Sequence, residues 1–273
     1  MTSPASALML WIAALLAILT VGCQTARPPD ASVRGSSVEA IKTRGLLKVG
    51  VRQDLIRFGY LEPMTNGWDG FEVAIARDMA AALLGDGGRI ELVRVTATQR
   101  LPYLRDGTVD LVVAQLGPAP GGDIELSETY FVGGVGVLLR RDRPASSVDD
   151  LAAPICAVKR SRALDRLSAR LPTAGTMLVD TPTECLLALE GGLVGAAVGE
   201  IPALVGLAVQ SPAVVVAPFR LQDEPLGIGV PAGQTDLREA VNDTLRRIKS
   251  SGRWAALYRQ YFGGILPDVA PPA

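Results

Sequence analysis

The sequence predicts an α/β protein made of two lobes, with two hinge strands joining the lobes across a cleft. Short apolar strands alternate with helical segments, which is typical of a parallel sheet. This alternation occurs twice, and an extended segment follows each run, at 128–142 and at 225–233. The chain has 273 residues and is 48% hydrophobic, so two domains can each bury a core.

The N-terminal residues 7–22 form an apolar run without a charge. The run is short for a membrane span, but it fits the apolar region of an export signal. It ends in LTVGC, which resembles a bacterial lipobox, so we expect Cys23 to be lipidated and to become the mature N-terminus. The alternative is an uncleaved anchor helix that ends at a chance cysteine. We interpret 1–22 as a signal peptide and 23–37 as a flexible tether.

The first lobe is predicted to open with a short helix, because Ser36 and Glu39 form a capping-box pattern. A long helix should precede Gly85, a C-cap candidate, because four apolar residues spaced four apart share one helical face. Those residues are Phe71, Ile75, Met79 and Leu83. The remaining elements are strands at 46–51, 89–95 and 110–114 and a helix within 96–107.

The second lobe repeats the pattern, and two C-terminal helices follow it. Its strands are predicted at 154–158, 176–180 and 195–199, with helices at 161–171, 181–192 and from Glu200 onward. The last helices, 235–252 and 253–264, should return to the first lobe. We therefore expect lobe one at 38–140 and 225–264, lobe two at 141–224 and a tail at 265–273. Hinge closure around a ligand is the usual behaviour of such an architecture.

Composition excludes several classes of function. The chain has 27 basic and 28 acidic residues and 5% aromatic residues, so nothing predicts nucleic-acid binding. It has no histidine, which removes the most frequent general base and zinc ligand. Triads with histidine cannot be built, and nucleophile-elbow, phosphate-loop and Cys-x-x-Cys motifs are absent. We expect no catalysis, metal or cofactor, and a monomer.

Cys156 and Cys185 remain once Cys23 is assigned to the lipid. Disulfides persist outside the cytoplasm, and an even number of cysteines favours one bridge. A loop of about thirty residues would gain roughly 3–4 kcal/mol from closure. The alternative is two buried free thiols that act as small hydrophobic groups.

Several stretches together resemble the family 3 extracellular solute-binding proteins of amino-acid ABC transporters. They occur in the family's order over about 38–264 and read GLLKVGV, GFEVAIARDMAAALLG, DGTVDLVVA, SSVDDLA, EPLGIGV and SGRWAALYRQYFG. The segments ICAVK and TECLLALEGGLVGAAVGE are similar to the glutamate-binding branch, in which matching cysteines form a bridge. The resemblance implies a type II periplasmic-binding-protein fold, no catalysis and delivery of a ligand to an ABC permease. A lipid on the outer face of the cytoplasmic membrane would keep the receptor near that permease.

The loop after the third strand departs from the family. Relatives hold the ligand's α-carboxylate there with the arginine of Thr-x-Thr-Pro-Glu-Arg. The corresponding residues here are 117–122, the hydroxyls are gone, and Gly122 stands where the arginine belongs. Gln115 and Gly117 remain as binding candidates, because glycine lets a ligand approach the backbone closely.

The second lobe carries different charges. Arg160, Ser161 and Arg162 stand where the family has Gly-Ser-Thr, at the start of a helix. Free N–H groups at a helix start favour an anion, and arginine binds carboxylates in a two-pronged manner. Glu200 falls on the position of the aspartate that holds the ammonium. We expect Arg160 or Arg162 to hold a carboxylate and Glu200 an ammonium; the alternative for both arginines is a solvated surface.

Lobe one offers Arg52, Asp54, Phe58 and Trp68 near positions that line the cleft in relatives. The two aromatic residues would cover an apolar ligand stem, or they pack in the core. The leading function is capture of a small polar ligand, an amino acid such as glutamate or a related anion. A sensory or regulatory subunit with a changed ligand is the second hypothesis. A cell-wall enzyme similar to lytic transglycosylases is the third, and it would need a further catalytic domain.

Overall fold

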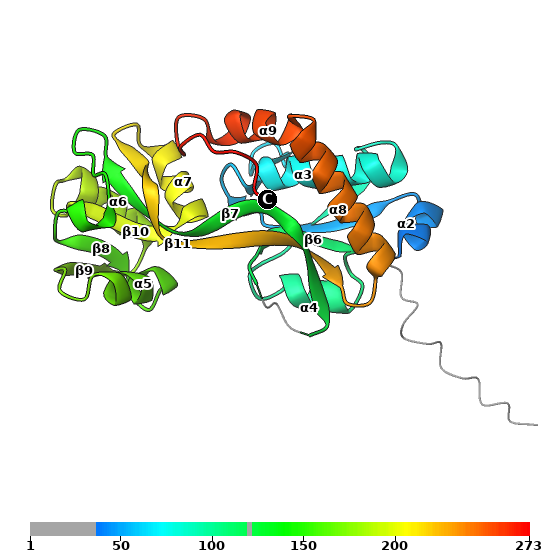
Figure 1. Cartoon of the computed structure of the whole chain (residues 1–273), viewed down its shortest axis with the longest axis horizontal. Coiled ribbons are helices and arrows are strands. Elements are labelled where there is room, and N and C mark those ends of the chain that lie inside the picture. Colours follow the sequence, from blue (N-terminus) through cyan, green and yellow to red (C-terminus); the bar gives the residue numbers. More distant parts are fainter. Residues whose placement is uncertain (1–36, 119–121) are drawn as a thin grey trace, which may run out of the picture. The chain divides into compact units, whose positions relative to one another are not determined.

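The computed structural model describes residues 37–118 and 122–273. The predicted signal peptide, the tether to residue 36 and the lipidation site at Cys23 lie outside these residues. The described residues form one compact unit (Figure 1). None of the helices in the described part of the chain is long and apolar enough to cross a membrane.

One eight-stranded sheet runs through the unit. Its order is β5-β1-β6-β11-β7-β10-β8-β9. The parallel strands β1, β5 and β6 lie at one end and β8, β9 and β10 at the other, while the long strands β7 and β11 pair with each other antiparallel (Figure 1). The bounds are β1 Leu47–Val51, β5 Ile90–Arg94, β6 Leu111–Leu116, β7 Ile124–Arg140, β8 Ile155–Val158, β9 Thr176–Val179, β10 Ala196–Glu200 and β11 Val214–Pro231.

The two long strands join the two ends of the sheet. β11 pairs with β6, and β7 pairs with β10, so ladder hydrogen bonds continue from one lobe into the other. The sequence predicted both connecting strands, but β11 begins at Val214 rather than at residue 225. The early start follows from pairing, because Val214, Val215 and Val216 lie opposite residues 138–140 of β7.

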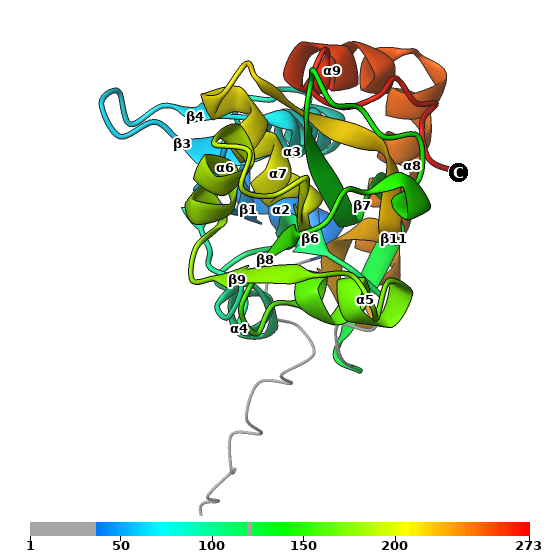
Figure 2. The same cartoon turned by 90° about the vertical axis from the view of Figure 1, so that its left-hand side faces the viewer.

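Helices flank both ends of the sheet (Figures 1 and 2). The four residues predicted to share one face of the long helix are all buried, and Gly85 ends that helix in the left-handed conformation, as predicted. The bounds are α2 Val38–Arg44, α3 Phe71–Leu84, α4 Arg100–Arg105, α5 Arg162–Arg170, α6 Pro182–Glu190, α7 Ile201–Gln210, α8 Thr235–Ser250 and α9 Arg253–Phe262, with a short 3₁₀ turn at Val148–Asp150.

The first helix starts one residue later than its predicted cap requires. Ser37, not Ser36, is the N-cap, and its hydroxyl accepts the Ala40 N–H at 3.2 Å. A tertiary contact accounts for the shift, because Asp236 of α8 accepts the Val38 N–H at 3.0 Å. The predicted pairing of Ser36 with Glu39 is therefore wrong.

A small second sheet was not predicted. Its strands are β2 (Asp54–Leu55), β3 (Gly59–Leu61) and β4 (Trp68–Asp69). Figure 2 shows the hairpin of β3 and β4 projecting from the unit. Strands of two or three residues give no readable alternation, so hydrophobic periodicity could not reveal them.

Aromatic residues of lobe one form the centre of its core. Phe58, Phe71, Phe131, Trp254 and Phe262 are all at most 1% exposed. The Phe58 ring lies 5.1 Å from the Phe131 ring, edge to face, and 4.7 Å from the Phe262 ring. Such pairs contribute about 0.5–1.5 kcal/mol beyond area burial. This packing attaches the C-terminal helix α9 to the first lobe.

The predicted disulfide is confirmed. Cys156 on β8 and Cys185 on α6 form a bridge, and both residues are buried. The bridge attaches the second lobe's sheet to the helix that covers it.

One glycine lies where the two long strands approach each other closely. Gly134 of β7 has φ +107°, and a Cβ there would collide with the Gln222 carbonyl of β11. The ladder between β7 and β11 also shifts register between Val216 and Gln222. A side chain at residue 134 would therefore separate the two strands where they pass from one lobe to the other.

Candidate functional site

A cavity of about 260 Å³ lies where the hinge strands meet both ends of the sheet. Part of its lining comes from loops and helix starts that follow the parallel strands. Ligands of α/β proteins usually bind at this edge of the sheet. The described lining residues comprise three arginines, two glutamates, three glycines and four other residues. They are Arg52, Ala97, Arg100, Gln115, Gly117, Gly133, Gly134, Arg162, Glu200, Pro202, Glu224 and Leu226. We call this cavity the cleft.

Arg162 lies between two carboxylates on the second-lobe side of the cleft. It is the first residue of α5, and its Nη1 donates to Glu224 Oε1 of β11 at 2.7 Å. Its Nε donates to Glu200 Oε1, at the end of β10, at 3.1 Å. The bond to Glu224 is the main cause that raises the pKa of Arg162. The two predicted partners of the ligand, Arg162 and Glu200, are therefore bound to each other.

Arg52 carries a positive charge on the first-lobe side. Its guanidinium binds Asp54 through two parallel hydrogen bonds of 2.8 and 2.6 Å. This bidentate pair lowers the pKa of Asp54. Asp54 itself is exposed and is not among the residues that line the cleft. Its contribution is to orient Arg52.

Arg100 is a partly buried cation of the cleft. It opens α4, and its Nη1 donates to the carbonyls of Ala114 and Gln115 at 2.6 and 2.7 Å. Its Nε is buried and makes no hydrogen bond to the described residues. Burial, first among the causes, lowers the pKa of this guanidinium, although arginine stays charged. Arg100 therefore lines the cleft as a cation that makes no ion pair with a carboxylate of the described residues.

The end of β6, which we call the cleft floor, contains a residue in an uncommon backbone conformation. Gln115, near the end of β6, has φ +58°. Its N–H points to Glu72 Oε1 at 3.2 Å and to the Tyr130 hydroxyl at 3.3 Å, and the Tyr130 hydroxyl also donates to that carboxylate oxygen. Glu72 is completely buried, and this burial raises its pKa to about 7. A carboxyl group beneath the floor therefore supports the backbone that lines the cleft.

Gly117 lines the cleft beside Glu224. A Cβ at this position would collide with the Glu224 carboxylate. The first residue of the depleted loop thus allows the hinge glutamate to reach the cleft. Gly122 is exposed, and residues 119–121 lie outside the described part of the chain.

The structure places the other predicted residues away from the cleft. Phe58 is 0% exposed and packs in the aromatic core, which was its alternative. Trp68 is half-buried on β4 and packs against the same core. Arg160 is exposed and is not among the residues that line the cleft. Ser161 caps α5 by accepting the Leu164 N–H at 3.1 Å, and its hydroxyl donates to the Val158 carbonyl at 2.7 Å.

The sequence interpretation missed Arg100, Glu224 and Glu72. Arg100 had a usable signal, because it follows a predicted strand and so falls at the carboxyl edge of the sheet. Glu224 had none, since its position depends on how β11 crosses β7. Glu72 occurs in an apolar helical face, and only the fold places Tyr130 against it.

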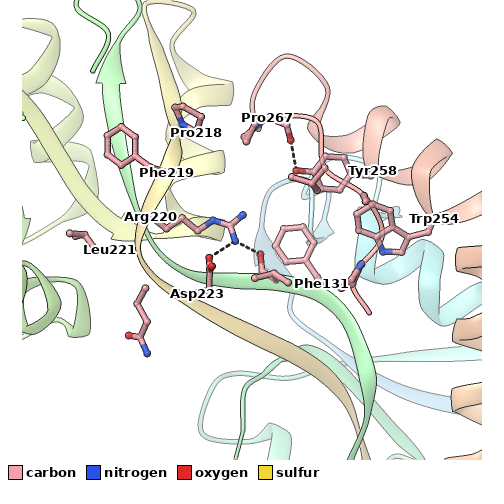
Figure 3. A pocket seen from close by; sticks show the side chains of 14 residues that line it. Phe131, Pro218, Phe219, Arg220, Leu221, Asp223, Trp254, Tyr258 and Pro267 are labelled. Carbon is pink, nitrogen blue, oxygen red and sulfur yellow. Dashed lines mark hydrogen bonds and ion pairs between the residues drawn. The ribbon is translucent and has the colours of Figure 1, made fainter. Parts of the chain in front are cut away.

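A second cavity, of about 540 Å³, lies between the hinge strands and α9 (Figure 3). Aromatic side chains line much of it, including Phe131, Phe219 and Tyr258. Arg220 crosses it and donates to the Val132 carbonyl at 2.9 Å and to Asp223 at 3.2 Å (Figure 3). None of the predicted binding residues lines this cavity, so we take the smaller, charged cleft as the candidate ligand site.

An α/β fold with a charged cleft between two lobes defines a receptor for a small solute. Residues 47–264 match the bacterial extracellular solute-binding proteins, family 3, and the chain belongs to this family. It is 30% identical over 239 residues to a glutamine-binding protein of Geobacillus stearothermophilus, covering 81% of this chain and 91% of that one. It is 28% identical to the ABC transporter glutamine-binding protein GlnH of Bacillus subtilis, covering 82% and 84%.

Solved structures confirm the predicted type II periplasmic-binding-protein fold. A solute receptor for L-cysteine of Neisseria gonorrhoeae is 29% identical with a TM-score of 0.62, covering 84% of this chain and 94% of that one. An ancestral cationic amino acid solute-binding protein is 26% identical with a TM-score of 0.70, covering 82% and 99%. A second structure of this ancestral protein is described as that of a precursor of cyclohexadienyl dehydratase. The family itself consists of extracellular binding proteins.

Proposed function

We propose that this chain is a lipid-anchored extracytoplasmic receptor that captures an amino acid, such as glutamate or a related anion, for an ABC permease. The relatives support the ligand class, because their names include glutamine-binding and glutamate-binding proteins. The receptor acts as a monomer, with lobe one at 38–140 and 225–264 and lobe two at 141–224. It catalyses no reaction: the chain has no histidine, and Cys156 and Cys185 are joined to each other.

The observation that carries the proposal is the presence of both charges in one small cleft. A free amino acid is a zwitterion, so its receptor needs a cation and an anion within the length of one ligand. Arg100 makes no ion pair with a carboxylate of the described residues, and Arg52 lies on the same side of the cleft. We assign the carboxylate to these two arginines. We assign the ammonium to Glu200 and Glu224.

This assignment differs from the one made from sequence. Arg162 already has two carboxylate partners, so a ligand carboxylate would have to compete with both of them. Hydrogen bonds to charged groups contribute about 1.5–3 kcal/mol each. Arg52 has one carboxylate partner, Asp54, and Arg100 has none among the described residues. In this assignment Arg100 binds the ligand carboxylate in place of the arginine that is absent from the loop at 117–122.

A thermal-shift screen tests the ligand class. Purified protein is heated with each of the common amino acids and with small dicarboxylates. A ligand at about 100 times its Kd adds roughly 2.7 kcal/mol to the free energy of unfolding, so it raises the melting temperature by several degrees. We expect a shift with glutamate or glutamine.

Intact-mass spectrometry of membrane-extracted protein tests the anchor. We expect a mature chain that begins at a lipidated Cys23. A chain that begins at Met1, or at another residue without a lipid, would remove the anchor from the proposal and leave the cleft unaffected.

The alternative is a sensory or regulatory subunit that kept the fold and changed its ligand. The loss of every hydroxyl and charge from the loop at 117–122 favours it. A screen in which amino acids leave the melting temperature unchanged, together with a sensor kinase encoded beside the protein, would support this alternative.

A further inference from the structure

We propose that Glu72 is a positioning residue of the cleft, which acts from beneath the floor through the Gln115 backbone and Arg100. Glu72 does not line the cleft, and its side chain is completely buried. The inference rests on the proposed function, because it takes the cleft as the ligand site.

The first step runs from Glu72 to Gln115. Gln115 has φ +58°, a region that costs a residue with a side chain about 1–2 kcal/mol. Its N–H lies 3.2 Å from Glu72 Oε1. Hydrogen bonds to an ionised acceptor are roughly twice as strong as bonds between neutral groups. The buried carboxylate therefore offsets the cost of the conformation that β6 adopts at the cleft.

The second step runs from Gln115 to Arg100. The Gln115 and Ala114 carbonyls accept from the same Nη1 of Arg100 at 2.7 and 2.6 Å. The orientation of the Arg100 guanidinium thus depends on the peptide groups on both sides of Gln115. A change in the Gln115 dihedral angles would turn the guanidinium that we assign to the ligand carboxylate.

The surroundings of Glu72 make the orientation of Arg100 sensitive to pH. Tyr130 of β7 and the Gln115 N–H of β6 bind its Oε1, and the positive charges of Arg52 and Arg100 face it across the floor. Its Oε2 is buried and makes no hydrogen bond to the described residues. Burial raises the pKa of Glu72 to about 7, and no histidine in the chain titrates near it. Protonation replaces the charged acceptor by a neutral one.

The test begins without ligand. The protein is labelled with ¹⁵N-arginine, and the Arg100 Nε–H resonance is assigned with Arg100→Lys. We expect this resonance to move with a midpoint near the pKa of Glu72. In Glu72→Gln, which keeps an acceptor but cannot ionise, it should not move. In Tyr130→Phe, which removes a bond that favours the ionised form, the midpoint should rise. Glu239→Gln, an exposed glutamate on α8, is the matched control and should titrate as the wild type does.

Calorimetry with L-glutamine then tests the effect on binding, because this probe keeps its zwitterionic charge between about pH 5.5 and 8. We expect wild type to bind roughly five- to tenfold more weakly at the lower pH. Glu72→Gln should bind with the same weak affinity at both. A folded Glu72→Gln protein whose Arg100 resonance still titrates, or whose affinity keeps the wild-type pH dependence, overturns the inference. If wild type binds no amino acid while the Arg100 resonance follows Glu72, the coupling stands and the proposed function fails.

Discussion

Arg162 Nη1 lies 2.7 Å from Glu224 Oε1, so the first residue of a second-lobe helix is bound to a hinge strand. Glu224 reaches this position because residue 117 has no side chain. The pair places a negative charge in the cleft beside the arginine that the sequence predicted to bind a carboxylate. A ligand therefore meets a mixed charge distribution rather than a positive patch.

Replacing Glu224 by Gln should change the preference of the cleft between glutamate and glutamine. The substitution removes one negative charge and keeps the shape. The loss of an ammonium partner weakens the binding of both ligands alike. The ratio of their Kd values therefore isolates the effect on the side-chain carboxylate of glutamate. We expect the ratio to move toward glutamate by about fivefold, roughly 1 kcal/mol. A ratio equal to that of wild type would place the ligand side chain away from Glu224.

Substitution of Gly134 by Ala should destabilise the protein. Its φ of +107° is unfavourable for alanine, and the new Cβ would collide with the Gln222 carbonyl. We expect a loss of about 1–3 kcal/mol, measured by urea unfolding. Gly206→Ala on α7 is the control, because a Cβ there meets open space; it should raise stability by about 0.5–1 kcal/mol. Equal effects of the two variants would contradict the close approach of β7 and β11.

Removal of the Cys156–Cys185 bridge should lower the free energy of unfolding. The cysteines are 29 residues apart, and a loop of this length is expected to contribute about 3–4 kcal/mol. The measurement is denaturant unfolding of Cys156→Ala/Cys185→Ala beside oxidised wild type. Reduced wild type serves as the control and should resemble the double variant. If all three unfold at the same denaturant concentration, the bridge has no stabilising effect.

Stability should fall as the pH rises toward neutrality, and Glu72 should cause much of the fall. Burial raises the pKa of Glu72 from 4.5 to about 7 on folding. Between these values the folded state binds a proton that the unfolded state has released, so the free energy of unfolding decreases with rising pH. A shift of this size corresponds to roughly 3 kcal/mol. Glu72→Gln should flatten the profile in this window. A profile that stays as steep in the variant would assign the slope to other groups.

Much of the fold was predictable because it depends on local pattern. The apolar spacing of α3 gave its buried face, and Gly85 gave its end. The start of α2 was predicted one residue early, because Asp236, distant in sequence, binds the Val38 N–H. The strands β2–β4 were too short to show a period. The family resemblance supplied the topology, which alternation of strands and helices alone does not specify.

The site was less predictable because charges act through tertiary contacts. Arg162 and Glu200 do line the cleft, but their mutual hydrogen bond depends on how α5 meets the end of β10. Phe58 lies between β2 and β3, close to Arg52 in sequence, yet it packs in the core. The positions of Glu224 and Glu72 depend on pairing between strands that are far apart in sequence. Residue type therefore indicated which charges were available, and the fold determined their partners.

The central claim is that this cleft binds an amino acid through Arg100 and Arg52. Its most direct test is calorimetric titration of glutamate and glutamine into wild type, Arg100→Gln, Arg52→Gln and the control Arg166→Gln, an exposed arginine on α5. We predict that wild type and the control bind at least one of the two ligands with equal affinity. Each cleft variant should bind tenfold to a hundredfold more weakly, since a hydrogen bond to a charged group contributes about 1.5–3 kcal/mol. Wild type that binds neither ligand, or cleft variants that bind as tightly as wild type, would contradict the claim.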